Sequence, residues 1–234
     1  MRIKLTSVFT LSILTFFLWN CNGEKVSSKE FEQAVFYEIF PSIIDSIYFD
    51  KRLTPPPPPP PSYIDSNGTE IKFDSLQYKK ALENWKIRKK EIQKDTSAVY
   101  IVVSDSLSDY DREDFYELIN HFKPHKIVLD SRNIELDDRF KIDLSKLNAN
   151  KKNLKFKYSS EFPPGSEFWR TDFDHYIALN ISFGRILFDE KNEYGVLSGG
   201  YTRGRLNGSG FRIFIKRNDD GGWAIDEIVG TWVS

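Results

Sequence analysis

Cysteine is almost absent from this 234-residue sequence: Cys21 is the only one, so no disulfide can form within the chain. The same count excludes a metal site built on several thiolates, such as a structural zinc site. The sequence also lacks an excess of either charge, since its formal net charge is −1. Nucleic-acid-binding proteins usually carry a clear basic excess, so we expect no nucleic-acid partner.

Long apolar runs are lacking as well, apart from one at the N-terminus. Arg2 and Lys4 precede an uncharged stretch from Leu5 to Trp19, which is shorter than the ~20 apolar residues that a membrane-spanning helix needs. A short positive segment followed by such a stretch is typical of a secretory signal peptide. We therefore expect residues 1–20 to be a signal peptide that directs export.

The end of this apolar stretch indicates how it is processed. No alanine precedes Ala34, so the small-residue cleavage site of an ordinary secretory signal is lacking. Instead, Leu18-Trp19-Asn20-Cys21 resembles a lipobox, with leucine at position −3 and the lipidated cysteine at +1, although its two middle residues are larger than usual. The resemblance implies a lipid anchor on Cys21. The alternative is cleavage before Glu24, which would release a soluble protein.

The next two segments are expected to form a tether with an amphipathic helix (21–54) and a polyproline spacer (55–61). Apolar residues recur at four-residue steps from Phe31 to Ile47, which predicts a helix with a wide buried face. Pro41 is expected to kink or split that helix. The seven prolines that follow predict a polyproline II segment, read here as a stiff spacer, with a docking strip for an aromatic groove as the alternative.

Residues 62–234 are expected to form a globular domain with helical segments first and strands last. The early elements comprise a helix over 74–95, a strand over 98–103, a helix over 112–122 and a strand over 127–129, with 155–158 as a further candidate strand. The strand–helix–strand part resembles a small β-α-β unit. Alternating segments near 177–183, 193–202, 211–215 and 223–232 predict a four-stranded antiparallel meander. The expected fold class is therefore α+β.

Two of these elements carry unusual patterns. The helix over 74–95 opens with a capping-box pattern and holds seven lysines and arginines. Either it lies on a membrane surface, or it has a solvated face with mixed ion pairs, which is the commoner case. In the last strand, Trp223 and Ile225 are out of phase with Ile228 and Trp232. A bulge near residues 226–228 is predicted to bring all four toward the core.

No catalytic motif is complete. The glycine-rich stretch over 199–210 matches neither a P-loop nor a dinucleotide fingerprint, and is interpreted as hairpin and bulge glycines. Arg203 and Arg205 beside it are expected to project into solvent. The acidic run over 109–114 lacks the glycine and glutamate of a calcium loop and is interpreted as a helix start. His121 and His125 have no acidic residue close to them in sequence.

Asp172, Asp174 and His175 form the one carboxylate–histidine cluster. Such groups bind metals or transfer protons, but within four residues of a predicted strand they more often form the edge of a loop. We assign no catalytic residue, no metal and no cofactor. The cluster remains a candidate site for an alternative function, a hydrolase of envelope glycans or peptides.

The whole chain resembles a group of uncharacterised lipoproteins of the Bacteroidota. The resemblance rests on the lipobox, the aromatic-rich helix, the proline run and an ending of Gly221-Gly222-Trp223 and Thr231-Trp232-Val233-Ser234. It implies no activity. Together with the export signal, it leads us to expect a lipid-anchored protein of the cell envelope, in the outer membrane. We expect a non-enzymatic binding or accessory module whose partner is an envelope protein or glycan.

Overall fold

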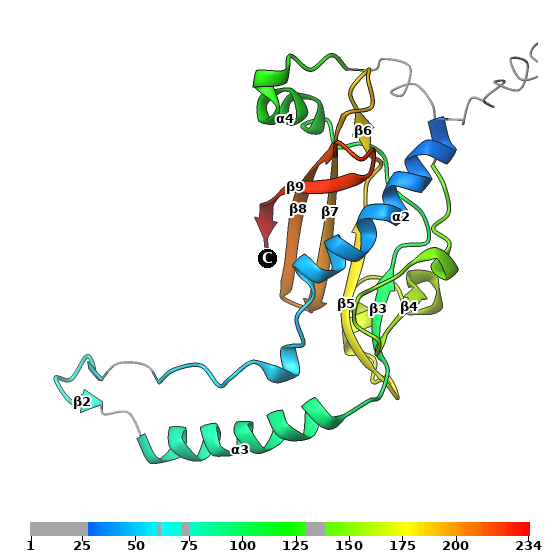
Figure 1. The fold of residues 1–234 in the computed structure, drawn as a ribbon. Helices are drawn as coiled ribbons and strands as arrows, with labels where there is room; N and C mark the ends of the chain where they lie inside the picture. Colours follow the sequence, from blue (N-terminus) through cyan, green and yellow to red (C-terminus); the bar gives the residue numbers. More distant parts are fainter. Residues whose placement is uncertain (1–27, 60–61, 72–74, 130–138) are drawn as a thin grey trace, which may run out of the picture.

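The computed structural model describes residues 28–59, 62–71, 75–129 and 139–234, which form an α+β fold around one mixed sheet of seven strands. Helix α2 (Ser28–Ile47) crosses one face of the sheet, and the short helix α4 (Asp114–His121) covers part of the other (Figure 1). Consecutive strand residues point to opposite faces, so Leu197 packs in the core beneath α2 while Val196 packs beneath α4. The predicted fold class is confirmed.

The strands are β3 (Val99–Val103), β4 (Leu154–Tyr158), β5 (Tyr176–Phe183), β6 (Leu187–Phe188), β7 (Tyr194–Gly204), β8 (Asn207–Arg217) and β9 (Trp223–Val233). They lie in the order β4-β3-β5-β7-β8-β9, and β6 pairs with β7. Strand β3 runs parallel to both of its neighbours, and all other pairs are antiparallel. The separate four-stranded meander that the sequence predicts is therefore not matched in detail, because its strands continue into a larger sheet.

The predicted strand over 127–129 is wrong. Leu129 makes only an isolated bridge to Asp189, and with Ile127 it packs against the small core beneath α4. The parallel partners of β3 are instead β5 and β4, and β4 was the weaker candidate strand from the sequence. A three-residue apolar run carries no signal that separates a strand from a packed loop.

Helix α2 supplies much of the main core. Its apolar face is buried against the sheet through Val35, Phe36, Ile39, Phe40, Ile43, Ile44 and Ile47. The helix continues through Pro41, so the expected split does not occur. Proline in a helix interior costs ~3 kcal/mol or more, and large aliphatic side chains buried on both sides of it offset that cost.

Between α2 and β3 the chain leaves the sheet as an arm (residues 51–95) that projects from the body (Figure 1). The arm holds the 3-10 turn η1 (Lys51–Leu53), the short pair β1 (Tyr63–Ile64) and β2 (Glu70–Ile71), and helix α3 (Ser75–Lys94). Helix α3 matches the predicted helix, and the predicted cap Asp74 lies outside the described residues. No described residue of α3 is buried.

Strand β9 contains the predicted change of phase. Its pairing with β8 shifts register at Asp226, and again at Thr231. The first shift places Ile225 and Ile228 against the main core, as predicted, and Trp223 is buried. The second shift turns Trp232 to the opposite face, where its side chain is 50% exposed. The prediction of a buried Trp232 is therefore wrong.

Candidate functional site

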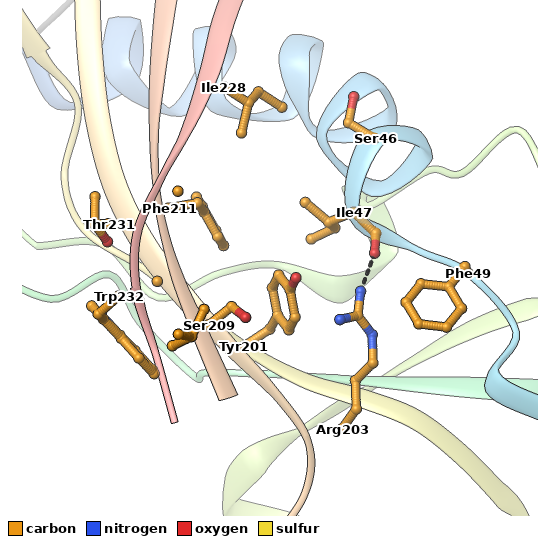
Figure 2. Close-up of a pocket in the computed structure, with 13 residues that line it drawn as sticks. Ser46, Ile47, Phe49, Tyr201, Arg203, Ser209, Phe211, Ile228, Thr231 and Trp232 are labelled. Carbon is orange, nitrogen blue, oxygen red and sulfur yellow. Dashed lines mark hydrogen bonds between the residues drawn. The ribbon is translucent and has the colours of Figure 1, made fainter. Parts of the chain in front are cut away.

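A cleft of about 570 Å³ opens between the end of α2 and the ends of the last three strands (Figure 2). Helix α2 and the turn after it contribute Ser46, Ile47 and Phe49, and the strands contribute Tyr201, Arg203, Ser209, Gly210, Phe211, Ile228, Gly230, Thr231, Trp232 and Val233. The cleft arises because α2 ends at Ile47 while the strands continue beyond it. This volume lies within the range of small-molecule sites.

Arg203 is the single charged residue among the described residues that line the cleft. Its guanidinium carbon lies 4.0 Å from the ring centre of Tyr201 and 4.4 Å from that of Phe49. Its Nη2 donates a hydrogen bond to the carbonyl oxygen of Ile47 at the C-terminal end of α2, where the helix dipole favours a cation. These contacts hold the guanidinium in place. The expectation that Arg203 projects into solvent is wrong, whereas Arg205 is exposed as expected.

The remaining walls of the cleft are mainly apolar and aromatic. The rings of Tyr201 and Phe211 stack with centroids 6.1 Å apart. Phe49 and Val233, at 50% and 86% exposure, form the rim. An aromatic floor with a fixed cation and the hydroxyl of Ser209 fits a ligand that has a flat apolar face and hydrogen-bond acceptors. No carboxylate, histidine or cysteine is found among the described lining residues, so these residues include no evident acid–base pair.

The glycine-rich stretch has a packing role that sequence reasoning missed. A β-carbon built on Gly210 would lie 2.0 Å from Nε1 of Trp232, and one on Gly200 would lie 3.1 Å from the same indole. A β-carbon on Gly199 would lie 2.6 Å from the ring of Phe211. The stretch forms the β7–β8 hairpin, with register shifts next to Gly204 and Gly210, as the interpretation of hairpin and bulge glycines predicts. In addition, Gly199, Gly200 and Gly210 leave room for two aromatic side chains next to the cleft.

The structure separates Asp172 from the other two members of the predicted cluster. Asp174 contacts Nδ1 of His175, and this hydrogen bond lowers the pKa of the Asp174 carboxyl. The Asp174 side chain is 95% exposed. The His175 ring packs on Tyr100, with centroids 4.5 Å apart, and Asp172 is exposed with no described contact to either residue. The three residues directly precede β5, with Asp172 and Asp174 exposed at the surface.

The acidic run before α4 surrounds a buried arginine, Arg212. Its Nε lies 2.7 Å from Asp114, and Asp111, Glu113 and Glu117 lie within 3.9 Å of its other nitrogens. Burial alone would lower the pKa of Arg212, but the hydrogen bond and charge of Asp114 outweigh it and raise the pKa. These acidic residues lie at the start of α4, as predicted, and they also form ion pairs with Arg212 on the sheet. The ion pairs connect α4 to β8.

His121 has acidic partners that its sequence neighbourhood does not reveal. Its Nε2 lies 2.7 Å from Asp226 and its Nδ1 lies 3.5 Å from Glu227, both on β9. The ring stacks on Phe214 with centroids 3.8 Å apart. The contacts of His121 with Asp226 and Glu227 connect α4 to β9, the edge strand of the sheet.

Two further predictions concern membranes and metals. Cys21 and the signal segment lie outside the described residues. In the part of the chain that the structure describes, no helix has the length and apolar character needed to cross a membrane. Within that same part, no group of three or more potential metal ligands is found.

Comparison of the chain with models of protein families, with curated proteins and with solved structures finds no match.

Proposed function

We propose that this protein is an exported lipoprotein that is anchored to the outer membrane by a lipid on Cys21 and acts as a non-enzymatic binding module of the cell envelope. The anchor is supported by the signal-like N-terminus and by the lone cysteine at its end. The binding role is supported by one observation above all, the aromatic cleft in which Arg203 contacts the rings of Tyr201 and Phe49.

The ligand that fits this cleft best is an envelope glycan. Sugar rings present apolar C–H faces that stack on aromatic rings, and their hydroxyl and carboxyl oxygens accept hydrogen bonds from arginine and serine. Tyr201, Phe211 and Phe49 provide the rings, while Arg203 and Ser209 provide the donors. The alternative of a hydrolase is supported only by the contact between Asp174 and His175. Asp174 is 95% exposed, and no described contact links it to Asp172.

The anchor is tested by the intact mass of the membrane-bound protein, expressed in a bacterium with lipoprotein processing. We expect a mature chain that begins at Cys21 and carries acyl chains. The variant Cys21→Ser should accumulate as an unprocessed precursor. An unmodified mature chain that begins at Glu24 would disprove the anchor but leave the cleft proposal standing.

The binding role is tested by photocrosslinking in intact cells. A photoreactive phenylalanine analogue is placed at Phe49 on the rim of the cleft, or at Tyr116 on α4, which is 73% exposed and does not line the cleft. We expect a glycan-bearing adduct at Phe49 that disappears in the Arg203→Ala background and is absent at Tyr116. Equal labelling at both positions, or none at Phe49, would contradict the proposal.

A further inference from the structure

Helix α3 is unusual because it spans 20 residues and buries none of those described. One of its faces is partly covered and carries Tyr78, Ala81, Leu82, Trp85, Lys89 and Ile92. On this face Nε1 of Trp85 donates a hydrogen bond of 3.3 Å to the carbonyl oxygen of Leu53 in η1. In the proline run beyond Leu53, Pro56 and Pro59 are the less exposed residues, with the three-residue spacing of polyproline II. Segment η1 thus contacts the face of α3 that carries Trp85, and the opposite face is exposed.

The open face combines exposed aliphatic side chains with lysines. Leu76 is 75% exposed and Ile87 is 58% exposed. They are eleven residues apart, which is close to three helical turns, so they lie along one line of the helix. The charged residues around this line are Lys79, Lys80, Lys86, Lys90, Lys94, Glu83 and Glu91. This pattern of aliphatic residues among long basic side chains is typical of helices that lie in a membrane interface.

The charge of the chain is concentrated in this helix. Residues 75–94 contain seven basic and two acidic residues, a formal charge of +5, while the whole chain carries −1 and the rest of it therefore carries −6. One exposed ion pair is described within α3, between Lys86 and Glu83 at 2.8 Å. Such an exposed pair contributes little to stability, and two acidic residues cannot balance seven basic ones, so the face keeps a net positive charge.

We propose that α3 is a membrane-contact helix whose open face binds an anionic phospholipid surface. The lysine ammonium groups would lie among the lipid phosphates, and Leu76 and Ile87 would enter the interface between headgroups and acyl chains. An acidic protein could match the charge, but a bilayer also accepts isolated aliphatic side chains anywhere along the row without a shaped pocket. We therefore favour the bilayer as the occupant.

The proposed contact does not depend on the lipid at Cys21. Helix α3 lies at the opposite end of the molecule from the start of α2, which follows the signal segment (Figure 1). With both attachments, the protein would be held at two ends and lie along the surface. Because the described core is contained within residues 28–234, the contact can be measured on a chain that begins at Asn22 and has no cysteine.

The experiment is sedimentation of this chain with vesicles of phosphatidylcholine containing phosphatidylglycerol. We expect binding to these vesicles, little binding to pure phosphatidylcholine, and loss of binding as sodium chloride is raised, because salt screens exposed charges. Each lysine near an anionic surface contributes about 1 kcal/mol, or about fivefold in the partition coefficient. Reversing Lys79, Lys80 and Lys90 to glutamate should therefore reduce binding by on the order of 100-fold or more.

The matched control reverses Lys151, Lys152 and Lys155, three exposed lysines around β4 that carry the same total charge. This control should retain most of the binding, and circular dichroism should show that both variants are folded. Ile87→Ser should weaken binding about tenfold if that side chain enters the apolar interface. The proposal is overturned if the parent does not bind the anionic vesicles, if the control loses binding equally, or if Ile87→Ser has no effect.

Discussion

The indole of Trp232 lies directly on the backbone of Gly210, so closely that a β-carbon on that glycine would lie 2.0 Å from Nε1 of the ring. The two residues are cross-strand partners in β8 and β9. Glycine weakens a strand when it stands alone, and an aromatic side chain laid over it restores packing at the sheet edge. The close approach orders the last residues of β9, which form one side of the cleft.

This contact predicts that Gly210→Ala destabilises the protein by about 1–3 kcal/mol, because the added methyl group must displace the indole. Gly230→Ala is the matched control, since nothing lies within 4 Å of a β-carbon built at that position in β9. Chemical denaturation of both variants measures the difference. Equal stability of the two would mean that Trp232 is not seated on Gly210 in solution.

A second prediction concerns the buried ion pair that fixes α2 to the sheet. Nη2 of Arg185 lies 2.9 Å from Oε2 of Glu32, both side chains are 3% exposed, and Glu32 also accepts a hydrogen bond of 2.8 Å from the backbone of Ile186. Removing one partner leaves a buried charge unpaired, which costs ~3–5 kcal/mol. We expect Glu32→Ala to lose about this much unfolding free energy, whereas Glu30→Ala, exposed on the same helix, should lose under about 1 kcal/mol. A small loss at Glu32 would show that water reaches the pair.

The third prediction compares the two tryptophans of β9. Trp223 is 9% exposed, packs against Phe188 with ring centroids 5.3 Å apart, and donates a backbone hydrogen bond of 2.7 Å to Glu38 of α2. Trp223→Ala should therefore cost ~3–5 kcal/mol and sharply reduce soluble yield. Trp232→Ala, and deletion of residues 231–234, should cost clearly less because Trp232 is half exposed. Thermal melts of the three variants give the order, and a reversed order would contradict the assigned faces of β9.

Local periodicity was enough to predict the elements whose pattern persists over many residues. The four-residue repeat of α2 and the alternation in β5 and β8 survive in the structure, with bounds shifted by a few residues. The bulge at Asp226 was also predictable, because four large apolar residues in one strand cannot share a face without it. Trp232 escaped the same reasoning, since a second bulge at Thr231 turns it away.

The candidate cleft was beyond the reach of sequence reasoning because it depends on contacts between distant segments. Arg203 is held by Ile47, which precedes it by 156 residues, and by the ring of Phe49. His121 likewise meets Asp226 across 105 residues. A residue pattern reports which face of an element is apolar, but not which other element ends beside it. The clue that was present, an excess of aromatic residues, did not indicate where they gather.

The fourth prediction follows from Asp226, whose carboxylate joins β9 to α4 and β8. Hydrogen bonds from Lys216 and then His121, at 2.6 and 2.7 Å, lower the pKa of Asp226 below its ordinary value of 3.8. A carboxyl whose pKa is lower in the folded state stabilises the fold above its unfolded pKa, and this contribution is lost as the pH falls through 3.8 toward the folded value. Asp226→Asn should therefore be less stable than the parent at neutral pH and should converge with it as the pH falls from about 5 to about 2. Asp219→Asn, in the exposed turn before β9, should follow the parent curve throughout. Thermal melts across this pH range measure the convergence, and parallel curves for Asp226→Asn and the parent would show that the carboxylate gains nothing from its partners.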